Sequence, residues 1–438
     1  MKIFNRVGPA LLMTFALLGA SACDTSEILE VNDPDLVTPS NVQGEKGAEL
    51  FWAGAIGQFA DAFSSGGGGQ AVYSGMLSDE FLLSGTFPTR NEVDRREMDD
   101  RNGTLTGEYR SLHQARVGLK NAAERLEEFL PGDERIAEMW SLNGYTYLFF
   151  AEHYCSGVPF SQTPNEGDIV YGTQTTTAEM LQTAISRFQS AAGATAGSSD
   201  QEYLAAVGLA RAYLNQGQYD QAASAVSSVP DDWAYLVRSK GGGAFGQRNA
   251  IYELNHSQRR WSLSDMEGGN GIAFRSDSDS RVPWQDSGQT GFDEETPLFH
   301  QLKYDSWDAD VPLATGVEAR LIEAEADLSN GGSQWLTILN DLRTAEGLGT
   351  LTDPVTDAER VDLLFEERAR WLFGTAHRLG DMRRLIRQYG RSQADVFPVG
   401  AYHKGGEYGS DVNFPIPFEE LENPELSGLT EVCLNRDA

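Results

Sequence analysis

Apolar residues recur at helical spacing along most of the chain, and this periodicity predicts a fold built mainly of helices. The segments with such an apolar face are residues 45–63, 109–130, 133–154, 179–192, 201–230, 318–342 and 361–389. The helix over 133–154 becomes apolar nearly all round toward its end, so we expect it to be central and buried. We therefore predict a mostly all-α protein with little strand.

Two stretches of the chain carry a repeat of small and bulky residues. Within 201–230 the repeat follows the tetratricopeptide pattern, in which small residues let two antiparallel helices approach and tyrosines fill the groove between them. A weaker copy lies within 318–342. We predict tetratricopeptide-like helix pairs over about 104–230 and 315–345, stacked into a curved scaffold.

The region over about 231–312 differs from the helical segments. It has no helical period and is rich in Gly, Ser, Asp and Asn. Long irregular regions in compact helical proteins are usually functional or disordered, and disordered segments are depleted in aromatic residues. Aromatic residues are instead concentrated here: Trp233, Tyr235, Trp261, Phe274, Trp284, Phe292, Tyr304 and Trp307. We predict long functional loops in this region. The stretch 77–91 is also loop-like and contains Phe81, Phe87 and Arg90.

The segment 361–389 combines an apolar stripe with a high density of charge. Its acids and arginines can pair at helix-neighbour spacing and across the contact of two helices. The residues concerned are Glu367, Arg368, Arg378, Asp381 and Arg384. Structural ion pairs are the simpler interpretation, and the alternative is a catalytic carboxylate held by arginines.

The composition is strongly acidic. The 438 residues carry a formal net charge of −31, which argues against an electrostatic partnership with nucleic acid or with an anionic membrane surface. This length can bury a large core. Because no long Pro/Gly/Ser linker divides the chain, we expect a single body over 45–438.

The first 22 residues have the layout of an export signal. Lys2 and Arg6 form a basic start, and an apolar stretch and a small-residue cleavage site follow. Cys23 comes next, and the residues before it resemble the bacterial lipobox, so we expect a lipoprotein with Cys23 as its acylated N-terminus. The alternative is an ordinary signal peptide with a stray cysteine. Residues 23–44 are acidic and aperiodic, and we predict that they form a tether.

Two cysteines remain after removal of the signal, Cys155 and Cys433. In an exported protein such a pair is more often a disulfide than a metal site or a nucleophile. We predict that they are joined. The bond would connect the end of the helix over 133–154 with the C-terminal part of the chain.

The sequence lacks the motifs of catalysis and metal binding. Its six histidines are scattered, without an HExxH pair or a His/Cys cluster, and there is no G-x-S-x-G elbow. Ser276, Asp277 and Asp279 offer oxygen ligands for calcium, but a solvated loop is favoured because the glycine and terminal glutamate of an EF-hand are missing. We expect no enzyme activity, no metal and no cofactor.

Three separated motifs resemble the SusD/RagB family of nutrient-binding outer-membrane lipoproteins. The first comprises Glu367-Arg368-Ala369-Arg370, Phe373 and the stretch from His377 to Arg384. The second comprises Pro415-Ile416-Pro417, Glu419, Glu420 and Asn423-Pro424, and it completes a C-terminal motif region over 357–424. The third lies at the amino end, in Glu30 to Pro34 and Thr38-Pro39. The resemblance covers most of the chain and implies a SusD-like fold.

The resemblance also implies a function. Such a protein is lipid-anchored at the outer membrane, faces the cell exterior and touches the membrane only through its anchor. It captures a nutrient, most commonly an oligosaccharide and otherwise a peptide. It then delivers this ligand to a SusC-like TonB-dependent barrel transporter.

The ligand site is expected in the loops that precede the helix over 318–342, because flat aromatic rings suit sugar faces. The candidate ligand-binding residues are Trp284, Tyr304, Trp307, Trp261, Arg281 and Phe87. For each of them the alternative is a place in the core. Two rival functions remain: a tetratricopeptide-type envelope assembly or scaffolding lipoprotein with a groove of small and polar residues, and a secreted hydrolase.

Overall fold

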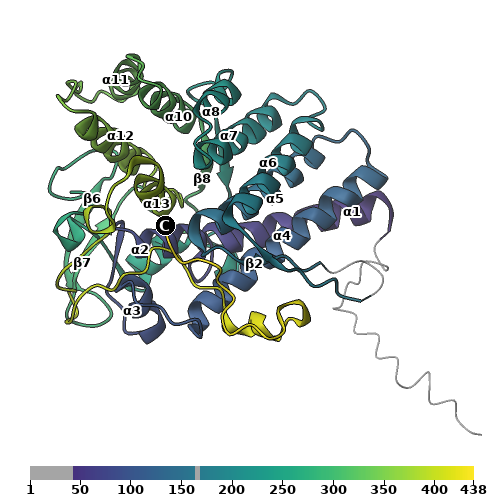
Figure 1. The fold of residues 1–438 in the computed structure, drawn as a ribbon, viewed down its shortest axis with the longest axis horizontal. Coiled ribbons are helices and arrows are strands. Elements are labelled where there is room, and N and C mark those ends of the chain that lie inside the picture. Colours follow the sequence, from purple (N-terminus) through teal and green to yellow (C-terminus); the bar gives the residue numbers. More distant parts are fainter. Residues whose placement is uncertain (1–42, 163–167) are drawn as a thin grey trace, which may run out of the picture. The chain divides into compact units, whose positions relative to one another are not determined.

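The computed structural model, which describes residues 43–162 and 168–438, is mostly helical (Figure 1). Its long helices are α1 (Gly44–Ser64), α4 (Gly103–Phe129), α5 (Arg135–His153), α6 (Thr177–Ala192), α7 (Ser199–Asn215), α8 (Tyr219–Val226), α10 (Gly316–Ser329), α11 (Trp335–Ala345), α12 (Asp357–Trp371) and α13 (Arg378–Tyr389). Every predicted helical segment is found, so the all-α fold class is confirmed. Four further helices had no periodic signal: α2 (Gly69–Leu77), α3 (Pro88–Asp94), α9 (Ala250–Tyr252) and α14 (Gln393–Val396).

The long helices pack one on the next in chain order. α4 contacts α5, α5 contacts α6, and α6 contacts α7; α8 then packs between α7 and α10, and α10 contacts α11 (Figure 1). Glycines permit close approach within this stack. An added Cβ at Gly144 of α5 or Gly208 of α7 would lie 2.8 or 2.2 Å from the ring of Phe188 in α6. The small-residue pattern of the sequence therefore reports real helix contacts.

Helix α5 occupies the centre of the helical stack, as its apolar sequence predicts. Nearly all of its residues are buried, because α4, α6 and α7 all pack against it. Just beyond its end, Cys155 forms a disulfide with Cys433, with 5.8 Å between the two Cα atoms. The sequence predicts this disulfide, which holds the C-terminal segment against the end of the central helix.

Strands are few and short in the described residues, as expected. Four antiparallel pairs occur: β1 (Phe81–Leu83) with β5 (Trp261–Leu263), β2 (Val158–Pro159) with β3 (Gln174–Thr175), β4 (Ala234–Val237) with β8 (Val311–Thr315), and β6 (Trp284–Thr290) with β7 (Pro297–Gln301). Three of these pairs use strands from the region over 231–312. Pairing therefore gives this aperiodic region a defined backbone.

A cluster of buried ion pairs joins α12, α13 and α10, and we call Arg368, Asp381, Arg384 and Glu325 the buried network. Arg368 donates two hydrogen bonds to Asp381, at 2.8 and 2.9 Å. Arg384 donates to Asp381 at 2.7 Å and also pairs with Glu325. Burial would raise the pKa of Asp381, but Arg368 and Arg384 hold that pKa well below its usual range. All four side chains are sealed from solvent, so the structural interpretation of these charges is right.

Two further buried pairs join segments that are far apart in the chain. Arg378 of α13 donates to both oxygens of Asp79, which lies just before β1, at 2.7 and 2.8 Å. Arg211 of α7 donates to Glu152 of α5. Arg378 therefore has a structural role, like the arginines of the buried network.

Residues 44–438 form one compact unit. The predicted signal peptide over 1–22, the lipidation site Cys23 and the tether up to residue 42 lie outside the described residues. Among the helices that are described, none combines the length and the apolar character needed to cross a membrane.

Candidate functional site

Three of the six predicted ligand-binding residues are core residues, which corrects that expectation. Trp261, the first residue of β5, is only 1% exposed and packs edge-on against Tyr73. Tyr304 is 2% exposed and donates its hydroxyl proton to the carbonyl of Phe373 at 3.2 Å. In an aperiodic loop, the neighbouring residues do not indicate whether a tryptophan or tyrosine is buried or exposed. The sequence could therefore not distinguish core aromatic residues from surface ones here.

Arg281 is also unavailable to a ligand. Its guanidinium donates to both oxygens of Glu367 and to both oxygens of Asp279. These bonds raise the pKa of Arg281 against the opposing effect of burial. The residue connects the loop before β6 to α12, which is a structural role.

Trp284 and Trp307 lie nearer the surface. Trp284 is half-buried in β6, where its indole N–H donates to the carbonyl of Arg275 at 3.1 Å and its ring meets Phe299 of β7 edge-on. Trp307 is 38% exposed. Its indole N–H donates to Glu253 at 2.5 Å, so the ring is fixed in place.

Trp307 belongs to a row of rings along the open end of the β6–β7 hairpin. Its ring meets Tyr252 at 5.8 Å, Tyr252 stacks on His256 at 4.5 Å, and His256 lies 4.1 Å from His300. Burial lowers the pKa of His300 to about 4, so this ring is neutral at pH 7. The row forms an aromatic surface in which Trp307 is the exposed member.

Phe87 is the predicted residue that the structure places in an exposed cluster. Its ring is 47% exposed, and Phe292, in the turn between β6 and β7, is 45% exposed. Arg260 lies over both rings, with its guanidinium carbon 4.7 Å from the centre of Phe87 and 4.2 Å from that of Phe292. Arg90 lies 4.9 Å from the centre of Phe87. We call these four residues the Phe–Arg cluster.

Local structure positions each member of the Phe–Arg cluster. Phe87 is the extended residue before α3, and Pro88 starts that helix, where its fixed φ suits the first turn. The stretch 77–91 was predicted to be loop-like. The structure shows that α3 begins within it, and this helix carries Arg90. Arg260 stands directly before β5.

The turn that carries Phe292 is held by backbone hydrogen bonds. The N–H of Phe292 donates to the carbonyl of Arg259 at 2.8 Å, and the N–H of Asp293 donates to the carbonyl of Ser84 at 3.0 Å. Gly291 lies so close to Ser84 that an added Cβ would be 2.3 Å from the serine Cβ, so only glycine fits. Lys404 pairs with Asp293 and donates to the carbonyl of Gly85 at 2.9 Å. The two exposed rings are consequently held on a fixed frame.

The electrostatics of the Phe–Arg cluster differ from those of the buried network. Neither Arg90 nor Arg260 forms an ion pair with a carboxylate in the part of the chain that the structure describes. The pKa of Arg260 is lowered, first by partial burial and then by the neighbouring positive charge of Arg90. The cluster thus combines exposed aromatic area with two guanidinium groups whose charge is not neutralised.

Sequence reasoning named Phe87 as a site residue but missed its partners. Arg90 and Phe292 were visible only as members of a loop and of an aromatic-rich region, and Arg260 had no signal at all. They meet because β5 pairs with β1 and because the hairpin turn folds onto Ser84. Such contacts join residues far apart in the chain, which periodicity cannot detect.

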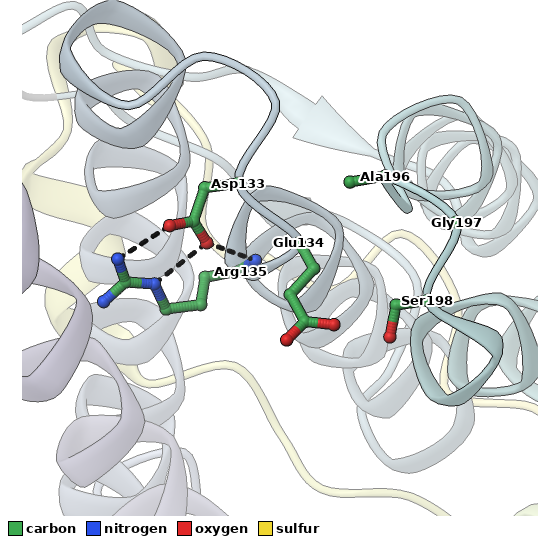
Figure 2. Close-up of a pocket in the computed structure, with 6 residues that line it drawn as sticks. All are labelled: Asp133, Glu134, Arg135, Ala196, Gly197 and Ser198. Atoms are coloured by element: carbon green, nitrogen blue, oxygen red, sulfur yellow. Dashed lines mark hydrogen bonds and ion pairs between the residues drawn. The ribbon is translucent and has the colours of Figure 1, made fainter.

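The structure also contains a shallow polar depression, shown in Figure 2, where the α4–α5 connection meets the α6–α7 connection. It is lined by Asp133, Glu134, Arg135, Ala196, Gly197 and Ser198. Arg135 is already bonded to Asp133, at 2.9 and 2.7 Å. With no aromatic ring in its lining and with Arg135 already paired, this depression is a weaker candidate than the Phe–Arg cluster.

Metal chemistry receives no support from the side chains that are described. Over residues 43–162 and 168–438, no group of three or more His, Cys, Asp or Glu side chains is arranged to hold an ion. Asp277 and Asp279, the calcium candidates, face arginines instead: Asp277 pairs with Arg370, and Asp279 with Arg281.

Comparison with known proteins identifies solved structures that share the fold of this chain. No protein-family model and no curated protein matches the chain. Among solved structures, surface glycan-binding protein A from Bacteroides thetaiotaomicron matches with a TM-score of 0.68 at 12% identity, over 89% of this chain and 99% of its own. A SusD-like carbohydrate-binding protein from Bacteroides fragilis matches with a TM-score of 0.66 at 16% identity, over 88% of this chain and 99% of its own.

A laminarin-binding SusD-like protein matches as well, with a TM-score of 0.65 at 15% identity, over 87% of this chain and 98% of its own. These matches run across nearly the whole length of each structure. The chain therefore has the SusD-like fold, and the fold that the sequence motifs implied is confirmed.

Proposed function

We propose that this protein is a cell-surface, lipid-anchored glycan-binding protein and that the Phe–Arg cluster contacts the ligand. The observation that carries the proposal is the pair of exposed phenylalanine rings around Arg260, held on a rigid turn. Flat rings bind the apolar faces of sugars by area and stacking, while a few polar groups fix orientation. The fold supports the proposal because solved proteins that share it are described as carbohydrate-binding, glycan-binding or laminarin-binding.

The wider role follows from the sequence motifs. A lipid on Cys23 would anchor the protein at the outer membrane, and delivery to a SusC-like TonB-dependent barrel would follow capture. No catalytic step is part of this role. A rigid stack of helices that carries fixed loops suits capture and release, because the site needs little reorganisation on binding.

Binding is tested by affinity electrophoresis and calorimetry of the purified protein against a panel of polysaccharides. Replacing Phe87 or Phe292 by alanine should weaken binding about tenfold, since each loses one stacking surface. The matched control is Phe245→Ala, which removes a ring that is 46% exposed and lies outside the cluster. The proposal fails if the control weakens binding as much as the two cluster variants, or if no polysaccharide binds.

Delivery is tested by mild-detergent purification from the native membrane. Recovery of a large barrel protein in stoichiometric amount supports the transport role. Recovery of envelope assembly proteins alone would favour the scaffolding alternative.

One observation favours that alternative. A shallow depression on α7 and α8 is lined by Tyr213, Asp220, Gln221, Ser224 and Ala225. Apart from Tyr213, these are the small and polar residues that a scaffolding groove is expected to present. Substituting Ser224 by arginine would block this surface, and it should leave glycan binding unchanged if the Phe–Arg cluster is the site.

A further inference from the structure

The two arginines of the Phe–Arg cluster differ in their electrostatic setting from the arginines of the buried network. The chain has 65 acidic residues and only 34 lysines and arginines, so an arginine has many potential partners. Arg378, Arg368 and Arg384 each have a carboxylate partner in the interior. Arg90 and Arg260 sit near one another instead, and within the described structure neither is neutralised.

The arginines lie with their flat faces over aromatic rings, and each has a buried guanidinium nitrogen without a hydrogen-bond partner. A guanidinium that covers a ring is attracted through its flat face, whereas its N–H groups point outward in the plane. Arg260 is held this way by two rings, and its Nε donates to Gln258 at 3.1 Å. Nη1 of Arg260 and Nη1 of Arg90 have no hydrogen-bond partner.

An unpartnered guanidinium nitrogen is costly unless something binds to it. A buried donor that makes no hydrogen bond loses its hydration without compensation, typically about 1–3 kcal/mol. Both arginines are half-buried, so a shift of the side chain toward a ligand oxygen would let the ligand accept this bond and would recover that loss. The fork of donors on a guanidinium matches the oxygens of a carboxylate or a sulfate.

The surrounding charges leave the arginine charge exposed. Glu108 interacts with Arg90 from the protein side, but burial raises the pKa of this carboxyl to about 8, so it is protonated at neutral pH. Asp293 is paired with Lys404. Glu294 and Glu295, on the same turn as Phe292, are exposed, and neither pairs with an arginine of the cluster in the described residues.

The overall negative charge does not prevent the binding of an anion here. At physiological ionic strength charges are screened over about 8 Å, so distant carboxylates contribute little to the potential at the cluster. Hydrogen-bonded charges in direct contact are screened much less. The local pair of arginines therefore dominates.

We infer that the Phe–Arg cluster binds an acidic saccharide, with Arg90 and Arg260 holding a carboxylate or sulfate group of a sugar whose ring face lies against Phe87 or Phe292. This inference rests on the proposed glycan-binding function and specifies the ligand class. Neutral saccharides would use only the rings and would leave the guanidinium donors unpaired. The protein should therefore prefer anionic glycans over neutral ones of the same backbone.

The test uses polysaccharides that share a backbone and differ in charge. One set is chondroitin, which carries uronate carboxylates, carboxyl-reduced chondroitin, which is neutral, and chondroitin sulfate. A second set is polygalacturonate and its methyl ester, and alginate, laminarin and xylan complete the panel. The charged member of a bound set should bind at least about tenfold more tightly than the neutral member, as one charge-assisted hydrogen bond provides. Comparing unsulfated with sulfated chondroitin distinguishes a carboxylate site from a sulfate site.

Variants connect the preference to the two arginines. Arg90→Gln and Arg260→Gln should each lower affinity for the acidic glycan about ten- to hundredfold while changing affinity for a neutral glycan less than about threefold. Arg260→Lys keeps the charge but loses the fork, so an intermediate loss is expected. The control is Arg238→Gln, whose side chain is 76% exposed and pairs with Asp310 elsewhere. Circular dichroism and thermal unfolding establish that each variant is folded.

The outcomes separate the two proposals. If neutral glycans bind as tightly as acidic ones, or if the arginine variants discriminate between them as the wild type does, the acidic-ligand inference is overturned and the glycan-binding function stands. If no glycan of either kind binds, both are overturned. If a variant unfolds, the salt dependence of the wild type decides, because the affinity for an acidic glycan should fall with rising salt and that for a neutral glycan should not.

Discussion

Two groups of arginines in this protein have opposite surroundings. Those of the buried network on α12 and α13 are sealed from solvent and bonded to carboxylates, so their charge serves the fold. Those of the Phe–Arg cluster are partly exposed, lie over phenylalanine rings and have no acidic partner among the described residues. The density of charge in the sequence points to the first group. Unneutralised charge in the structure points to the second.

The difference shows which feature of an arginine indicates binding. A buried charge must be paired, since an isolated one is very costly, so a dense run of arginines and acids is more often structural than functional. An exposed pair of like charges without acids is mildly unfavourable for the free protein. Its presence next to exposed rings is better explained by a ligand than by stability.

The largest expected effect tests the buried network. Asp381→Asn keeps the shape of the side chain but removes the charge that Arg368 and Arg384 share. Leaving two buried arginines undercompensated should lower the free energy of unfolding by about 3–5 kcal/mol, measured by denaturant titration. Asp277→Asn is the control, because the Asp277 side chain is 51% exposed and its pair with Arg370 should contribute less than about 1 kcal/mol. Equal losses in the two variants would remove the distinction between the regions.

A somewhat smaller loss is expected beneath the Phe–Arg cluster. Trp261→Ala deletes a ring that is 1% exposed, and large-to-small changes in a core cost about 3 kcal/mol or more. We expect a value near the lower end, because Arg90 is half-buried with its guanidinium carbon 5.8 Å from the centre of this ring, and its long side chain can shift toward the space. Trp307→Ala, at 38% exposure, serves as the comparison and should cost less than half as much. A loss of unfolding free energy in Trp261→Ala as small as that in Trp307→Ala would contradict the assignment of Trp261 to the core.

The pH dependence of stability offers a third test. A carboxyl whose pKa is lowered on folding adds stability above its unfolded pKa, near 3.9 for Asp, and this contribution is lost as the pH falls through that value toward the folded pKa. The pKa of Asp381 is lowered in this way by Arg368 and Arg384. The difference in unfolding free energy between wild type and Asp381→Asn should therefore be constant from pH 7 to about pH 5 and shrink below about pH 4. A difference that grows in acid would have the wrong sign for this mechanism.

The smallest effect is expected for the stability of the double variant Arg90→Gln, Arg260→Gln. Removing these two charges relieves their repulsion and their unpaired donors but also loses their contacts with the rings. These effects oppose one another, so the unfolding free energy should change by no more than about 1 kcal/mol. Thermal unfolding at low and high salt measures it. A loss above about 2 kcal/mol would mean that these arginines belong to the structural group after all.

The sequence predicted the helical part of the molecule in detail. The helix over 133–154 appears as the buried α5, and the repeat over 201–230 appears as α7 and α8. The Cys155–Cys433 disulfide is present too. In each case the signal is local or compositional: a periodic apolar face, a repeat of small residues, or the only two cysteines left after the export signal.

Only the tertiary structure decided which aromatic residues and which arginines face solvent. Trp261 and Phe87 come from aperiodic stretches of similar composition, yet the pairing of β5 with β1 buries the first and leaves the second exposed. The hydrogen bond from the Ser84 hydroxyl to the Arg259 carbonyl joins residues 175 positions apart, and contacts of this kind place Arg260 between Phe87 and Phe292. The buried face of a helix can be identified from the periodicity of its own sequence. The burial of a loop residue depends on contacts with residues far away in the chain. The sequence by itself therefore determined the helical scaffold, and the tertiary structure determined the candidate site.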